Sequence, residues 1–275
     1  MNYPAKTVTV NGVKLNVIDA GHGEPVLLVH GFPDTHAVWR EQIPALLAAG
    51  YRVIAPDTRG CGDSEMPPGV ADYRIDKLVA DLAALLDALA IDKVKLVSHD
   101  WGAVIGWQFL MAHPQRVERA VMLSVGHPSA YGSGGIAQKL KGYYILLFQL
   151  RGVAEWVLKL ANWRLFGLFT GFAAELPHWR AALSRPGRLT AGINYYRANL
   201  HLVLPRTYPR VSVPVVGIYS DGDRFLTRKQ MSASAAFCDA GFDYIEVAGA
   251  NHWMQLHMPA PVNAAVLAAL QQDQQ

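Results

Sequence analysis

The stretch that decides the fold reads Leu96-Val97-Ser98-His99-Asp100-Trp101-Gly102-Ala103. An apolar run typical of a buried strand passes directly into a helical pattern, with Asp100 at the turn between them. Ser98 and Gly102 are small, as a sharp turn carrying a nucleophile requires, because the neighbouring backbones approach closely. Serine usually occupies the centre of such a turn, yet the chain contains no G-x-S-x-G pattern. An aspartate before a helix is often only an N-cap, but this context favours a nucleophilic carboxylate.

Short apolar strands alternate with helical patterns on both sides of this turn. A hairpin is expected at Asn11-Gly12. Further strands are expected at 26–29, 52–55, 94–97, 117–123, 214–220 and 244–247, and helices at 39–49, 75–89, 103–112 and 261–270. The alternation is interrupted after Ser124 by a helical, aromatic-rich segment. Because such alternation is typical of a doubly wound, mostly parallel sheet, we expect an α/β core domain at 1–125 and 210–275, carrying an inserted helical cap at 126–209.

Composition argues against several classes of protein and partner. Hydrophobic residues make up 51% of the chain and charged residues 17%, which is typical of a compact globular protein. The net charge of +3 comes from scattered Lys and Arg, so no nucleic-acid partner is expected. The longest apolar run, 143–148, is too short to span a bilayer, and we expect no membrane partner and a cytoplasmic location. Cys61 and Cys238 form no disulfide framework or metal cluster, and with no dinucleotide fingerprint we expect no cofactor and no metal.

Three further motifs accompany the Asp100 turn. They are His30-Gly31-Phe32-Pro33-Asp34, the turn Asp57-Thr58-Arg59-Gly60-Cys61-Gly62-Asp63-Ser64, and a late His252-Trp253. Together they resemble the aspartate-nucleophile branch of the α/β-hydrolases, which comprises epoxide hydrolases and haloalkane dehalogenases. The resemblance covers nearly the whole chain. It implies an α/β-hydrolase fold and hydrolysis without a cofactor through a covalent ester on Asp100.

The resemblance also suggests the partners of the nucleophile. His252 follows the last expected strand, where this fold carries the general base that activates water. Asp221 and Asp223 both follow the strand at 214–220 and qualify as the acid that orients His252. Asp223 falls in the family's usual position, and Asp221 then shapes the turn. The backbone N–H groups of Phe32 and Trp101 are the expected oxyanion-hole donors.

Opening an epoxide requires an acidic hydrogen-bond donor for the oxygen that becomes an alkoxide. Tyr144 and Tyr196 match the two lid tyrosines of epoxide hydrolases, although the adjacent Tyr143 and Tyr195 leave a one-place error open. Most tyrosines in an aromatic lid simply pack. Trp101 and Phe148 are candidate substrate-binding residues, although core packing explains Phe148 equally well. We therefore expect a small hydrophobic, epoxide-like substrate.

Two alternatives remain open from the sequence. A haloalkane or haloacid dehalogenase would use the same Asp100, with Trp101 and a lid tryptophan at 156, 163 or 179 holding the halide. Against it, Phe32 stands where many haloalkane dehalogenases have asparagine, and no arginine closely follows Asp100 to hold a haloacid carboxylate. The second alternative is a binding protein that kept the fold and lost turnover. The sequence does not decide between a monomer and a homodimer.

Overall fold

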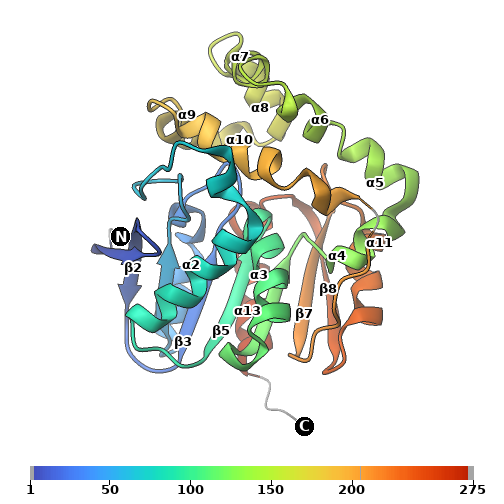
Figure 1. Cartoon of the computed structure of the whole chain (residues 1–275). Helices are drawn as coiled ribbons and strands as arrows, with labels where there is room; N and C mark the ends of the chain where they lie inside the picture. The colour runs from blue at the N-terminus through green and yellow to red at the C-terminus, as the bar shows by residue number, and fades with distance from the viewer. Residues whose placement is uncertain (1–2, 205, 272–275) are drawn as a thin grey trace.

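The computed structural model describes residues 3–204 and 206–271 and has an eight-stranded, largely parallel sheet at its centre (Figure 1). The strand order is β1-β2-β4-β3-β5-β6-β7-β8. The strands are β1 Ala5–Val10, β2 Val13–Ala20, β3 Pro25–Val29, β4 Arg52–Pro56, β5 Val94–His99, β6 Val117–Leu123, β7 Val215–Gly222 and β8 Phe242–Asn251. β1 and β2 form the predicted hairpin, and β2 pairs antiparallel with β4, whereas the strands from β4 to β8 pair in parallel. The predicted mostly parallel sheet is confirmed.

Helices cover both faces of this sheet. α2 and α3 pack together on one face, and α1 contacts α13 behind it (Figure 1). The core helices are α1 Gln42–Ala48, α2 Ile75–Ala88, α3 Trp101–Ala112, α11 Arg228–Ser232, α12 Met254–His257 and α13 Pro259–Gln271. Short 3-10 turns lie at η1 His36–Trp39, η2 Val70–Tyr73, η3 Pro114–Arg116 and η7 Ala233–Phe237. β5 is buried along its whole length, as expected for a central parallel strand whose two faces carry helices.

The boundaries differ from the predicted ones where a turn intervenes. The helix predicted at 39–49 is divided into η1 and α1, because the chain turns at Arg40 and Glu41. The helix predicted at 103–112 begins at Trp101, directly after Asp100. β8 is longer than the predicted 244–247 and ends one residue before His252. Both longer elements lead directly into the site described below.

The described residues between β6 and β7 form helices and turns above the edge of the sheet at which β5 and β6 end (Figure 1). These elements are α4 Pro128–Tyr131, η4 Gly132–Gly134, α5 Gly135–Lys141, α6 Tyr144–Gln149, α7 Val153–Lys159, α8 Arg164–Thr170, η5 Ala173–Glu175, α9 Leu176–Leu183, α10 Arg188–Ala198 and η6 Leu200–Val203. The Arg40 guanidinium anchors this segment through two hydrogen bonds to Glu175, at 2.9 and 2.7 Å. The insertion therefore covers the carboxyl ends of the strands, where α/β folds carry their ligands.

Two further sequence-based points concern the chain as a whole. Cys61 and Cys238 are both free thiols. Within 3–204 and 206–271, no helix has the length and apolar character needed to cross a bilayer.

Candidate active site

The turn between β5 and α3 holds Asp100 in a strained backbone conformation. Asp100 has φ 52° and ψ −123°, a region that a non-glycine residue rarely adopts and that concentrates at functional sites. Only glycine fits at position 102, because a Cβ there would collide with the carbonyl group of Val29. Ser98 is fully buried, and its hydroxyl contacts the Met122 sulfur at 2.9 Å. The turn therefore projects the Asp100 carboxylate beyond the edge of the sheet.

The two oxygens of Asp100 have different environments. The Phe32 backbone N–H donates to Oδ1 at 2.7 Å. Oδ2 lies 3.6 Å from His252 Nε2. The Trp101 amide opens α3, where the first N–H groups of a helix have no intrahelical acceptor. One carboxylate oxygen is thus held by a backbone donor, and the other faces the imidazole.

His252 lies between Asp100 and a second, fully enclosed carboxylate. Its Nδ1–H donates to Asp223 Oδ2 at 2.7 Å, and the exposed fractions of both residues are 2%. Asp223 Oδ1 accepts the backbone N–H groups of Phe225 and Leu226, at 2.8 and 2.9 Å. Asp221, in contrast, is exposed and accepts the Gly249 amide at 2.7 Å. Of the two candidate acids, Asp223 is the one in contact with the histidine.

The electrostatics of this pair follow from burial and charge. Burial alone would raise the pKa of Asp223, but the charge of His252 and three hydrogen bonds hold it below its usual value. Burial disfavours the charged imidazole of His252, yet the Asp223 charge and the nearby Asp100 carboxylate raise its pKa to about 10. The His252 imidazole is therefore protonated at neutral pH.

His99 is part of the site, and sequence reasoning assigned it no role. It is fully buried, and its Nε2–H donates to the backbone carbonyl of His252 at 2.9 Å. Burial and the neighbouring charge of His252 lower the pKa of His99 to about 3, so it stays neutral. Its place directly before Asp100, at the end of a buried strand, was the available signal. His99 thereby ties the segment that carries His252 to β5, the strand that leads into Asp100.

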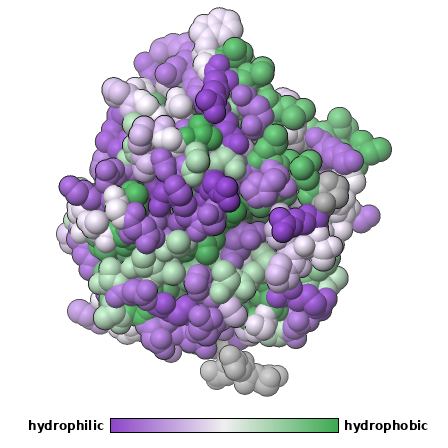
Figure 2. Space-filling model, in the orientation of Figure 1, coloured by the Kyte–Doolittle hydropathy of each residue, from purple (hydrophilic) through white to green (hydrophobic). Residues whose placement is uncertain are grey.

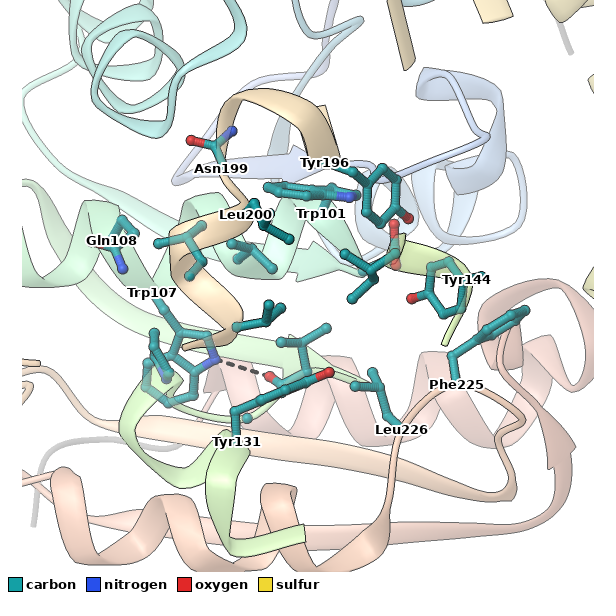
Figure 3. Close-up of a pocket in the computed structure, with 18 residues that line it drawn as sticks. Trp101, Trp107, Gln108, Tyr131, Tyr144, Tyr196, Asn199, Leu200, Phe225 and Leu226 are labelled. Atoms are coloured by element: carbon teal, nitrogen blue, oxygen red, sulfur yellow. Dashed lines mark hydrogen bonds between the residues drawn. The ribbon is translucent and has the colours of Figure 1, made fainter. Parts of the chain in front are cut away.

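Two tyrosines of the insertion line the same cavity as Asp100. Tyr144 comes from α6 and Tyr196 from α10, and their ring centroids lie 5.8 Å apart. Burial raises the pKa of both phenols well above the usual value, and the Asp100 charge adds to the effect. In Figure 3 both hydroxyl groups point toward the interior of the cavity. Both phenols therefore keep their protons and remain hydrogen-bond donors at neutral pH.

The neighbouring tyrosines point elsewhere. The Tyr195 hydroxyl lies 2.9 Å from Thr58 Oγ1 and donates to the Arg59 carbonyl oxygen at 2.7 Å. Tyr143 is 64% exposed. The one-place ambiguity between adjacent tyrosines is therefore decided by the direction of each side chain. Tyr144 and Tyr196 are the members of each pair that face Asp100.

An apolar cavity runs from Asp100 alongside α3 (Figure 3). α3 contributes Trp101, Val104, Trp107 and Gln108 to its wall, and Phe225 and Leu226 lie near Tyr144. Phe148 is fully buried and packs behind Tyr196 at a centroid distance of 4.9 Å, and it is not among the lining residues. Of the two predicted substrate-binding residues, Trp101 therefore lines the cavity and Phe148 supports a tyrosine from behind.

Asp34 occupies a position that sequence reasoning quoted without a function. Its carboxylate accepts the indole N–H of Trp179 at 2.7 Å and that of Trp253 at 2.9 Å. Burial raises the pKa of Asp34 to about 7, although both indole donors oppose the shift. Trp179 belongs to α9 in the insertion, whereas Trp253 directly follows His252. Asp34 thus connects the insertion to the segment that carries His252 and Trp253.

The lid tryptophans do not face Asp100. Trp156 is 63% exposed, and the indole N–H of Trp179 is already bonded to Asp34. Trp163 is buried beside Phe166 and is not among the residues that line the cavity. In the described part of the chain, no three His, Cys, Asp or Glu side chains are grouped so as to hold a metal ion.

Comparison with known proteins agrees with this architecture. Residues 24–259 match the family described as alpha/beta hydrolase fold. Epoxide hydrolase A of Mycobacterium tuberculosis is 33% identical, over 96% of this chain and 96% of its own length. The AB hydrolase superfamily protein YfhM of Bacillus subtilis has the same identity and coverage. The crystal structure of epoxide hydrolase A from Mycobacterium thermoresistibile has a TM-score of 0.85 and 31% identity, with each chain fully covered. The chain therefore belongs to the α/β-hydrolase-fold family, in the branch that contains these epoxide-hydrolase relatives, and it is a hydrolase.

Proposed function

We propose that this hydrolase opens a small hydrophobic epoxide to a vicinal diol through a covalent ester on Asp100. The observation that carries the proposal is that Tyr144 and Tyr196 line the same apolar cavity as Asp100. Two protonated phenols beside a carboxylate nucleophile suit an oxygen that leaves carbon as an alkoxide. The names of the relatives point to the same substrate class.

In the first step, Asp100 Oδ2 attacks one epoxide carbon while Oδ1 keeps its hydrogen bond from Phe32. The new ester C–O bond forms as the epoxide C–O bond breaks. The electron pair of the broken bond goes to the epoxide oxygen, which receives hydrogen bonds from Tyr144 and Tyr196 and a proton from one of them. Residues 126–209 act as a cap in this proposal, because they bring both tyrosines over the nucleophile.

After the first step, the protonated His252 imidazole returns a proton to the phenolate that the alkoxide left behind, so the tyrosine is restored and the imidazole becomes neutral. In the second step, the neutral His252 removes a proton from water, and the hydroxide attacks the carboxyl carbon of Asp100. The oxyanion then accepts hydrogen bonds from the backbone N–H groups of Phe32 and Trp101. Ester formation removes the Asp100 charge that helps to raise the pKa of His252, so the imidazole becomes easier to deprotonate when a base is required. Collapse of the oxyanion breaks the ester, releases the diol and restores the carboxylate.

The proposal predicts an intermediate that can be trapped. His252→Gln should still form the ester but should hydrolyse it slowly, so the intact protein should gain the whole mass of a small aromatic epoxide. Peptide mapping should locate the added mass on Asp100. The double variant Asp100→Ala/His252→Gln is the matched control and should gain nothing.

The same measurement separates the alternatives. Incubation with a haloalkane tests for a dehalogenase, which would add the alkyl group without halogen. The engagement of the Trp179 indole with Asp34 counts against that outcome. A folded His252→Gln protein with no adduct from any epoxide tested would contradict the proposed chemistry. Absence of turnover by the unmodified protein would then favour a binding protein.

A further inference from the structure

The outer face of the insertion carries an apolar stripe that the proposed chemistry does not use. We define the outer stripe as Ile136, Leu140, Tyr143, Leu146, Leu150 and Trp156, on and beside α5, α6 and α7. Each of these side chains is between 53% and 76% exposed. Figure 2 shows hydrophobic side chains gathered at the upper right, over α5 and α6.

The stripe is specific to this region of the molecule. Among the described residues, all large apolar side chains that are exposed fall between Ile136 and Leu204, and the α/β core has none. Ile136 and Leu140 lie four positions apart on α5, and Tyr143, Leu146 and Leu150 recur every three or four positions along and beside α6, the spacing that places side chains on one face of each helix. The opposite face of α6 holds Tyr144 and Phe148 inside the protein. α6 therefore has two apolar faces, only one of which the protein buries.

The charge distribution points to an anionic partner for this face. Residues 126–209 contain ten Lys or Arg and two Asp or Glu, a net charge of +8, whereas the rest of the chain has fifteen and twenty, a net charge of −5. Lys139, Arg151, Lys159 and Arg164 are exposed beside the stripe. Glu155, the acidic residue of this stretch, is bound by Arg197. Pairing two such faces in a dimer would bring like charges together, which disfavours a second copy as the partner.

The route to the cavity lies along the same face. A surface groove lined by Gly135, Lys139, Leu204 and Arg206 shares Tyr131 and Leu202 with the cavity that reaches Asp100. An apolar molecule held at a lipid surface would therefore meet the groove beside the stripe.

We propose that this face of the insertion docks on an anionic lipid bilayer surface. Exposed Leu, Tyr and Trp side chains with flanking cations are the features of elements that lie in a membrane interface. Docking of this kind requires no spanning helix. The proposal differs from the sequence-based expectation of no membrane partner, which rested on the lack of an apolar run long enough to span a bilayer. Binding itself does not depend on the proposed epoxide chemistry.

The test is sedimentation with vesicles. The full chain should bind vesicles made of equal parts phosphatidylcholine and phosphatidylglycerol, and should bind pure phosphatidylcholine much more weakly. Binding should decrease as ionic strength rises from about 0.05 M to about 0.5 M, because salt screens surface charges.

Matched variants separate the two contributions. Leu146→Gln/Trp156→Gln removes apolar area without changing charge and should weaken vesicle binding roughly tenfold or more. Lys139→Gln/Arg151→Gln should weaken binding to the anionic vesicles by a similar factor of roughly tenfold. The control Lys93→Gln/Lys229→Gln removes two exposed cations of the core and should have little effect. All of these side chains are exposed, so each variant should fold, which circular dichroism would verify.

Three results would overturn the proposal. The folded protein could fail to bind anionic vesicles, or the stripe variants could bind as well as the unmodified chain. The unmodified protein could instead form a dimer in light scattering that Leu146→Gln/Trp156→Gln dissociates, which would assign the face to a second copy.

A further readout rests on the proposed function: anionic vesicles should speed diol formation from a membrane-partitioned epoxide, and the stripe variants should lose that increase. Vesicle binding without turnover would support docking and contradict only the chemistry.

Discussion

The Asp100 turn and the two tyrosines of the insertion, Tyr144 and Tyr196, face the same cavity but are held in different ways. Asp100 lies in a turn with a strained backbone, and Gly102 of the same turn packs against Val29 of β3. Tyr144 and Tyr196 are held by aromatic contacts between distant segments, including Phe32 and Phe148. Backbone contacts, including those to Val29 and Phe32, therefore position Asp100, whereas packing between aromatic side chains positions the two tyrosines.

The largest effect should come from the nucleophile itself. Asp100→Ala should lower diol formation by roughly 10⁴-fold or more, since removing a covalent nucleophile has effects of that size. The steady-state rate with a small aromatic epoxide measures it, with circular dichroism as the control for folding. Full activity of this variant would contradict the proposed role of Asp100 as the nucleophile.

The tyrosines should have a smaller effect on rate. Tyr144→Phe and Tyr196→Phe should each lower kcat/KM by roughly 10²-fold, because each removes one donor to a developing oxyanion. Single-turnover measurements should locate the loss in ester formation rather than in its hydrolysis. Tyr143→Phe, at an exposed position, is the matched control and should change neither step.

The turn should be more sensitive to backbone crowding than the cap. Gly102→Ala places a Cβ against the Val29 carbonyl and should lower the free energy of unfolding by about 2–4 kcal/mol. Urea denaturation measures the change. Gly132→Ala in the cap is the control, because an added Cβ there meets nothing within 4 Å, and it should have almost no effect. Equal losses for both variants would contradict the tight packing of the turn.

Asp34, which connects Trp179 of the insertion to Trp253 beside His252, should make stability depend on pH. Its pKa is raised from 3.8 to about 7, so the folded protein holds this proton more tightly than the unfolded chain. The stabilisation is complete below pH 3.8 and is lost as the pH rises to about 7. Urea denaturation across this range should show this decline, by roughly a few kcal/mol. The decline should be reduced in Asp34→Asn, and an unchanged pH profile in that variant would contradict the assignment.

The smallest effect tests the direction of one side chain. Tyr195→Phe removes a hydroxyl that bonds with Thr58 and Arg59. The loss should lower the free energy of unfolding by about 1 kcal/mol and leave kcat within roughly twofold. Thermal and urea denaturation beside steady-state kinetics would measure both. A large loss of kcat would reverse the roles given to Tyr195 and Tyr196.

Much of the core could be predicted because its signals are local. The run 26–29 is apolar on both faces, which indicates a strand buried in a largely parallel sheet, and the Asn11-Gly12 hairpin has the usual turn residues. The Asp100 turn combines an apolar run with small turn residues. The insertion was predicted as helical, but its individual helices were not, since aromatic residues there occur in all directions around the helix axes.

The sequence by itself determined the alternating α/β fold and the turn at Asp100, because each rests on residues close together in the chain. The candidate carboxylates and histidine came from the resemblance to a known family. Only the tertiary structure decided which of Asp221 and Asp223 contacts His252, and which tyrosine of each pair faces Asp100. It also decided that the Trp179 indole binds Asp34 and that an apolar stripe lies outside the cap. Adjacent residues on a helix or turn point in different directions, and which direction meets the cavity depends on how distant segments pack against each other.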